Sequence, residues 1–121
     1  KLITADGKEY PMAGAITGVC EKKERLIRFG YVTIEPEQGQ EGLLRQGEQI
    51  RGHEFHYFDS TNNGCDCIAG KPVGKRSWTC IHADRSHFIG FPHLYYPSCP
   101  DFVINFVEQC RNWNRKRKGA K

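Results

Sequence analysis

The segment that most constrains the fold is residues 51–57, which read Arg-Gly-His-Glu-Phe-His-Tyr. In a β-strand, successive side chains point to opposite faces. A strand here would place one set of side chains on each face: His53, Phe55 and Tyr57 on one, Glu54 and His56 on the other. Turn-forming glycine and asparagine residues flank the segment. We therefore predict a short, well-buried strand whose ionisable side chains form either a site or a buried polar network.

Other apolar runs predict further strands around this one. Residues 27–34 alternate in polarity, and short strands are also expected at 65–69 and 77–81, the latter antiparallel to its neighbour. Residues 87–96 form another apolar run, in which Pro92 argues against a central position in a sheet. The pattern is that of a strand-rich domain.

A helix is predicted at the C-terminal end. Ser98 is suited to be its N-cap, and Pro100 to its first turn. An apolar stripe follows at helical spacing: Phe102, Val103, Phe106, Val107, Cys110 and Trp113. We expect this stripe to cover a sheet.

The length of 121 residues suits a single domain. We divide the chain into a domain portion, residues 1–113, and a basic, disordered tail, residues 114–121. The net charge of +4 is concentrated in and just before this tail. Nucleic-acid-binding segments combine basic residues with aromatic ones, and Trp113 is the only aromatic residue among these charges. A solvated helix end is therefore favoured over nucleic-acid binding.

The composition also indicates in which cellular compartment the protein is expected. No apolar run approaches the ~20 residues that a membrane helix needs, and no signal peptide is evident, so we expect no membrane association. Six cysteines are present, and the chain is rich in core-forming residues. We therefore expect free thiols and a cytoplasmic protein rather than a disulfide framework.

Four segments, in order, carry a resemblance to a known family. They are Asp-Gly at 6–7 with Tyr-Pro-Met-Ala-Gly at 10–14, Phe-Gly-Tyr at 29–31, the segment 51–57, and Phe-Pro-His-Leu-Tyr-Tyr at 91–96. Together they resemble the cobyrinate a,c-diamide synthases, in the glutamine amidotransferase-like part near the C-terminus of those enzymes. The resemblance implies an α/β fold of the class I glutamine amidotransferase type, present as a partial domain with a mixed sheet and a C-terminal helix.

The resemblance also implies a function. The parent enzyme would be an ATP-dependent ligase that uses glutamine to amidate the a and c carboxylates of a corrinoid, or a related tetrapyrrole, in cobalamin biosynthesis. ATP and Mg are the cofactors implied for that parent. This chain contains no Gly-x-x-x-x-Gly-Lys-Ser/Thr phosphate-binding loop, so we expect no cofactor in the chain itself.

His93 is the catalytic residue that the resemblance implies, as the base that activates the glutaminase cysteine. A thiol with a pKa of ~8.5 is a weak nucleophile until a base takes its proton. Tyr95 stands where the family has a second histidine, and a tyrosine cannot act as a base near neutral pH. We expect His53, Glu54, His56 and Tyr95 to support the substrate pocket. For the first three, the ammonia exit and a buried polar network are the alternatives.

The nucleophile itself is not apparent. None of the six cysteines lies in the small-residue context of a tight strand-to-helix turn. We therefore expect this chain to be the C-terminal fragment of a longer enzyme, holding the histidine half of the glutaminase site. The partner of this chain would be the missing N-terminal part. We expect the isolated chain to be inactive and to self-associate as a homodimer.

An alternative is a non-catalytic binding module stabilised by a metal. His53, His56, Cys65 and Cys67 offer four zinc ligands, but the C-x-C spacing departs from the common C-x2-C form. We accordingly predict no metal site in this chain.

Overall fold

The computed structural model describes residues 1–119, in which two long strands form the centre of the largest sheet. These are β4 (Arg28–Pro36) and β5 (Ile50–His56). The sheet has the order β11-β5-β4-β7-β8, and every pairing in it is antiparallel. Its outer strands are β7 (Cys67–Gly70), β8 (Ser77–Cys80) and β11 (His93–Tyr95). The strands predicted at 51–57, 65–69 and 77–81 are thus confirmed, although the second begins only at Cys67.

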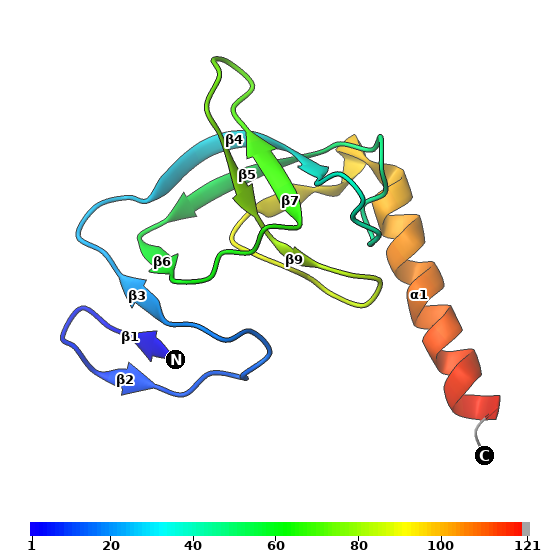
Figure 1. The fold of residues 1–121 in the computed structure, drawn as a ribbon, viewed down its shortest axis with the longest axis horizontal. Coiled ribbons are helices and arrows are strands. Elements are labelled where there is room, and N and C mark those ends of the chain that lie inside the picture. Colours follow the sequence, from blue (N-terminus) through cyan, green and yellow to red (C-terminus); the bar gives the residue numbers. More distant parts are fainter. Residues whose placement is uncertain (120–121) are drawn as a thin grey trace.

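Two smaller sheets accompany it within the described residues (Figure 1). One is mixed, with the order β2-β1-β3-β6, because β1 pairs parallel to β3 and the other pairs are antiparallel. Its strands are β1 (Leu2–Ile3), β2 (Glu9–Tyr10), β3 (Cys20–Lys22) and β6 (Phe58–Ser60). The other is a hairpin of β9 (His82–Ala83) and β10 (Phe88–Ile89).

A single helical region completes the described chain. A 3₁₀ turn, η1 (Tyr96–Ser98), leads into helix α1 (Pro100–Gly119). The expectation of an α/β chain with a mixed sheet and a C-terminal helix is confirmed at this level. No helix among residues 1–119 is both long and apolar enough to cross a membrane.

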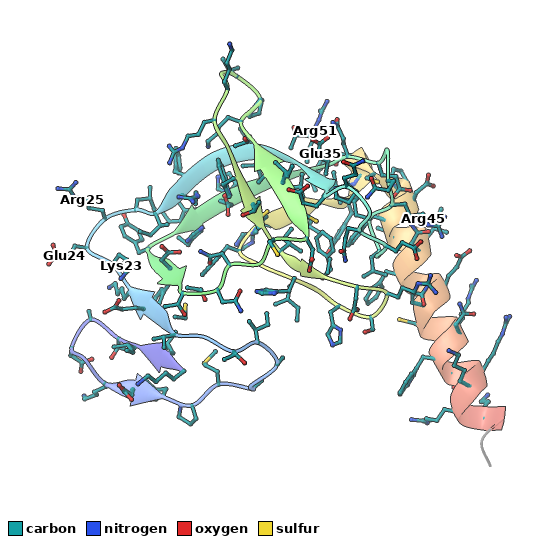
Figure 2. The ribbon with its side chains drawn as sticks, viewed as in Figure 1. Lys23, Glu24, Arg25, Glu35, Arg45 and Arg51 are labelled. Atoms are coloured by element: carbon teal, nitrogen blue, oxygen red, sulfur yellow. The ribbon has the colours of Figure 1, made fainter. Side chains whose placement is uncertain are left out.

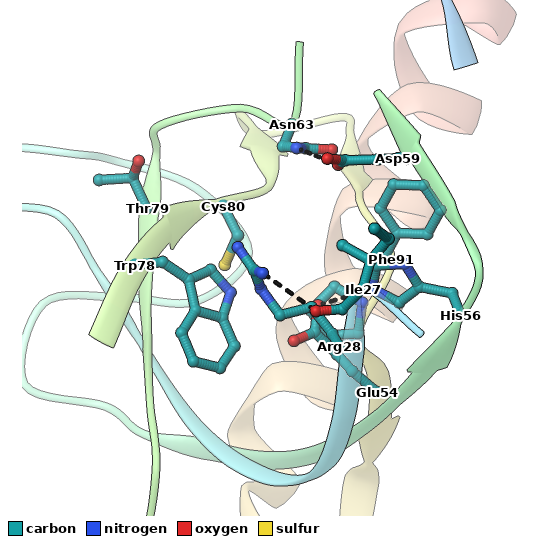
Figure 3. A pocket seen from close by; sticks show the side chains of 11 residues that line it. Ile27, Arg28, Glu54, His56, Asp59, Asn63, Trp78, Thr79, Cys80 and Phe91 are labelled. Carbon is teal, nitrogen blue, oxygen red and sulfur yellow. Dashed lines mark hydrogen bonds and ion pairs between the residues drawn. The ribbon is translucent and has the colours of Figure 1, made fainter. Parts of the chain in front are cut away.

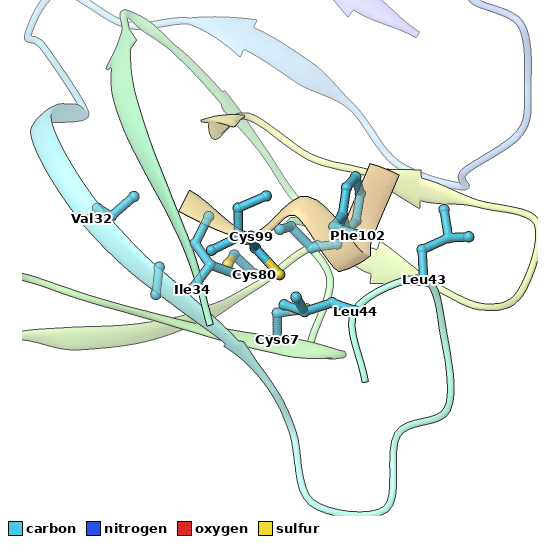
Figure 4. Close-up of a cluster of buried hydrophobic side chains, with 11 residues drawn as sticks. Val32, Ile34, Leu43, Leu44, Cys67, Cys80, Cys99 and Phe102 are labelled. Carbon is cyan, nitrogen blue, oxygen red and sulfur yellow. The ribbon is translucent and has the colours of Figure 1, made fainter. Parts of the chain in front are cut away.

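The hydrophobic core lies on one face of the large sheet. Leu43 and Leu44, in the loop between β4 and β5, and Phe102 of α1 pack against it (Figure 4). The cluster comprises Val32, Ile34, Leu43, Leu44, Ile50, Cys67, Ala69, Cys80, Ile81, Cys99 and Phe102. Burial of these side chains favours folding because it removes apolar surface from water.

Helix α1 departs from expectation in how it packs. Its only buried side chains are Phe102, which contacts the rings of Phe88 and Tyr96, and Asn105, whose amide donates to the Leu43 carbonyl at 3.0 Å. Beyond this first part the helix runs away from the sheets (Figure 1). The apolar stripe therefore covers a sheet only at Phe102. Its later residues are exposed, Trp113 to 69%, and for them the prediction is wrong.

Both ends of the helical region also differ in detail from the sequence-based picture. Ser98 does not cap α1, because it ends η1, where its hydroxyl donates to the Tyr95 carbonyl and accepts from the Arg51 amide. At the other end, α1 continues through Gly119, so residues 114–119 are helical where disorder was predicted. Lysine and arginine form helices well and suit a helix C-terminus electrostatically. Residues 120–121 lie outside the described residues.

A close backbone crossing joins the loop after β6 to the end of β8. Gly64 has a φ of +84° and bridges to Ile81, which has a φ of +68°. The Ile81 amide donates to the Asn63 carbonyl at 2.8 Å, and the Asp66 amide donates to the Ile81 carbonyl at 3.0 Å. A left-handed conformation is costly for a β-branched residue. These hydrogen bonds and the burial of Ile81 hold it there.

Candidate functional site

His93 lies on β11, an edge strand of the large sheet, and is exposed. It is aligned with His53 on β5, which in turn is aligned with Tyr31 on β4. The rings of Tyr31 and His53 are 5.7 Å apart between centroids. Residues directly opposite on neighbouring strands share a face, so the three side chains form one row across the sheet. The sequence separates these residues widely, and the register brings them together.

The row belongs to a larger exposed surface that we call the aromatic face. It consists of Phe29, Tyr31, His53, Phe55 and Tyr57, whose neighbouring rings make edge-to-face contacts with centroids about 6 Å apart. Tyr31 is 74% exposed and Phe55 is 53% exposed. The alternation predicted along β5 is confirmed, but its apolar face is the exposed one, because the core occupies the other side of the sheet. Nothing within residues 1–119 covers the aromatic face.

Tyr95 borders this surface. It follows His93 by two residues on β11, so both side chains lie on the same side of the strand, and it is 59% exposed. Its partner in register is Arg51, which points away from the core at the edge of the molecule (Figure 2). Among the predicted site residues, His93, His53 and Tyr95 are therefore gathered on one face of the sheet.

Glu54 and His56 lie on the opposite face, as the alternation predicted, and line a small cavity (Figure 3). The Glu54 side chain is only 3% exposed, and its Oε1 lies 3.5 Å from Nε2 of His56. The His56 ring stacks on Phe91, with centroids 4.1 Å apart. The predicted site is thus split by the sheet, and no single pocket holds all five residues.

The cavity also contains residues that the sequence did not single out. Arg28 is aligned with His56 across β4 and β5, and its guanidinium lies 4.7 Å from the Trp78 ring centre. Asp59 and Asn63 line the cavity from the segment after β5. The alternation of β4 could have placed Arg28 on the inner face, but no local signal brings Trp78 of β8 to it.

Cys80 shares this cavity with Glu54 and His56, which raises the question of a cysteine nucleophile. Burial, reinforced by the Glu54 carboxylate, raises the pKa of the Cys80 thiol to about 12. Burial likewise raises the pKa of Cys67 to about 12. A thiol needs a lowered pKa to act as a thiolate near neutral pH. Neither Cys80 nor Cys67 is therefore set up as a nucleophile.

The four side chains considered as zinc ligands, His53, His56, Cys65 and Cys67, do not lie together. His53 and His56 point to opposite faces of β5, and Cys67 is buried in the core while Cys65 is exposed. No group of three or more metal-ligating side chains occurs within residues 1–119. All six cysteines, each in that range, are free thiols.

The exposed aromatic face predicts self-association of the isolated chain. Pairing two copies through it would remove several large apolar side chains from water. We expect a concentration-dependent dimer in light scattering at high micromolar protein, and a monomer after Phe55→Lys. Val73→Lys is the matched control, because Val73 is 89% exposed yet lies in the turn between β7 and β8. A native chain that stays monomeric would contradict this expectation.

Comparison with curated proteins identifies relatives along most of the chain. A cobyrinate a,c-diamide synthase from Caldanaerobacter subterraneus subsp. tengcongensis is 28% identical over 113 residues, which is 92% of this chain. The enzyme of the same name from Listeria innocua is 32% identical over 82% of the chain, and that from Fusobacterium nucleatum is 34% identical over 81%.

The match covers only part of each relative. It corresponds to 25%, 23% and 21% of the three proteins, so the chain spans about a quarter of their length. No family model matches the chain, and no solved structure matches it significantly.

Proposed function

Because this chain is related in sequence to a segment of the cobyrinate a,c-diamide synthases, we propose that it is the C-terminal part of the glutamine amidotransferase-like domain of such an enzyme. In this proposal the chain supplies the histidine base of the glutaminase site. The observation that carries it is the position of His93, exposed on an edge strand beside an uncovered aromatic face.

The reaction of the complete enzyme would be the glutamine-dependent, ATP-dependent amidation of the a and c carboxylates of a corrinoid. ATP and Mg would bind the preceding part, since this chain has no phosphate-binding loop. The glutaminase half-reaction needs a cysteine thiolate, which attacks the side-chain amide of glutamine to give a thioester and ammonia. His93 would take the thiol proton and return a proton to the departing ammonia.

The nucleophile would come from the preceding part of the enzyme. Strands β4, β5 and β11, which form the face that carries His93, contain no cysteine, and burial raises the pKa values of Cys67 and Cys80 on β7 and β8. The preceding part would extend the sheet past edge strand β11 or pack on the aromatic face, bringing its cysteine to His93. The complete domain would then have the class I amidotransferase fold.

His53 and Tyr95 would support this site from the same face. The register places His53 beside His93, where an imidazole can orient either the base or the substrate. Tyr95 can hydrogen-bond but cannot replace a second basic histidine. A second candidate function is a non-catalytic binding module. One observation supports it, namely that Tyr95 replaces the second histidine of the family motif.

Reconstitution tests the proposal and separates the two candidates. The isolated chain should release no glutamate from glutamine, because a base without its nucleophile contributes little. Mixing it with the separately prepared preceding part of the parent enzyme should produce glutamate release that requires both pieces. Glutamate release by the chain alone, or none from a mixture shown to form a complex, would contradict the proposal.

A further inference from the structure

The outward face of the large sheet is aromatic where a face turned to water is normally polar. An antiparallel sheet that packs one face on the core usually carries polar side chains on the other. Here Phe29, Tyr31 and Phe55 stand exposed on the face opposite the core. Proteins rarely expose a contiguous apolar patch unless it binds another chain or ligand. The aromatic face therefore indicates a sheet that is built to be covered on both sides.

The aromatic face also has the composition of an interface centre. Phe29 is aligned with Phe55 across β4 and β5, with ring centroids 5.9 Å apart, and Tyr31 is aligned with His53. The five side chains of the face include no carboxylate, ammonium or guanidinium group. Interface centres are enriched in aromatic residues and depleted of charged ones. The surface thus matches the centre of an interface between protein chains.

The edge of β11 offers less to a partner than the aromatic face does. Strand β11 has only three residues, His93–Tyr95, and the chain turns into η1 directly after it. Pro92 precedes the strand and has no N–H to give to an added strand. A strand added at this edge would gain only a few main-chain hydrogen bonds. Packing on the face would instead remove several large rings from water.

The length of the relatives indicates what covers the face. About three quarters of each relative lies outside the part that this chain matches. A second copy of the chain could cover the rings, but strands β4, β5 and β11 of that copy contain no cysteine. A homodimer would therefore close the face without bringing a nucleophile to His93. The preceding part of the parent can do both.

We propose that the preceding part of the parent enzyme packs an apolar surface on the aromatic face, and that this complex and the homodimer of the isolated chain exclude each other. The proposal rests on the proposed function, and it selects packing on the face over extension of the sheet past β11. Both partners need the same rings, so binding of one removes the other. Self-association of the isolated chain is then the substitute for a missing layer of the parent.

Sedimentation analysis of the unaltered chain tests the exclusion. At a concentration where the isolated chain is dimeric, one equivalent of the separately prepared preceding part should convert the homodimer into a complex with one copy of each piece. A complex that contains two copies of this chain would overturn the proposal, because the homodimer would then persist beside the bound partner.

A matched pair of variants locates the docking surface. Phe55 and Ile104 are both 53% exposed, but Ile104 lies on α1 and is not part of the aromatic face. Measured by calorimetry at dilutions where the chain is monomeric, Phe55→Lys should weaken binding of the preceding part by about thirtyfold or more. Ile104→Lys should leave the affinity unchanged. Equal affinities of the two variants would overturn the proposal. If Phe55→Lys does not fold, Tyr31→Lys on the same face takes its place.

Glutamate release separates this proposal from the proposed function. A mixture that releases glutamate, and whose affinity is unchanged by Phe55→Lys, would overturn docking on the face and leave the role of His93 intact. A complex that is weakened by Phe55→Lys, and that releases no glutamate when the unaltered chain is saturated, would overturn the proposed function and leave the docking surface.

Discussion

Replacing Gly64 by alanine is expected to lower the free energy of unfolding by about 2–5 kcal/mol. A Cβ at this position would lie 2.3 Å from both the carbonyl carbon and the carbonyl oxygen of Ile81, and 2.7 Å from the His82 nitrogen. These are backbone atoms, which cannot rotate away as a flexible side chain would. The φ of +84° adds the cost of a left-handed conformation for a residue with a Cβ.

The matched control for this prediction is Gly47→Ala. Gly47 has the same φ of +84°, but a Cβ there would meet nothing within 4 Å. It should therefore show only the conformational cost, on the order of 1 kcal/mol. Chemical denaturation followed by circular dichroism measures both variants. Equal destabilisation by the two substitutions would show that the crossing of Gly64 and Ile81 is not as tight as described.

The comparison of sequence and structure along β5 shows what periodicity can predict. The alternation correctly assigned His53, Phe55 and Tyr57 to one face and Glu54 and His56 to the other. The alternation did not indicate which face is buried. The aromatic side chains suggested their own face, but that face is exposed. The buried face is determined by what packs on it, here Leu43, Leu44 and Phe102 from distant segments. Such packing has no signature within the strand itself.

Helix α1 also shows that a sequence pattern does not reveal which surface is buried. Its existence and its start near Pro100 could be predicted, because proline placement and helical spacing are local signals. The exposure of Phe106 and Trp113 could not, since the stripe looks the same whether or not a surface lies opposite it. The alignment of His93 with His53 likewise depends on which strands pair, and neither segment encodes that choice.

The second large effect is expected in the complete parent enzyme, where His93→Ala should lower glutamine-dependent amidation by about 10²–10⁴-fold. Without the base, the cysteine proton has no acceptor, and thioester formation slows accordingly. Amidation with free ammonia should remain largely intact, because ammonia bypasses the thioester. The exposure of His93 on an edge strand makes a folding defect an improbable cause of any loss.

His87→Ala provides a matched control for this variant. His87 is an exposed histidine in the turn between β9 and β10, where it contacts Asp84, and it is not part of the row formed by His93, His53 and Tyr31. It should leave both activities unchanged. A loss with His87→Ala similar to that with His93→Ala would point to a general effect on stability rather than to a base.

The ratio of glutamine-dependent to ammonia-dependent amidation, measured on the same folded preparation of the His93→Ala enzyme, tests the assigned role of this chain most directly. The proposed role of His93 predicts that this ratio falls by about 10²–10⁴-fold relative to the native enzyme, with the ammonia-dependent rate retained. An unchanged ratio, whether both rates persist or both are lost together, would contradict it.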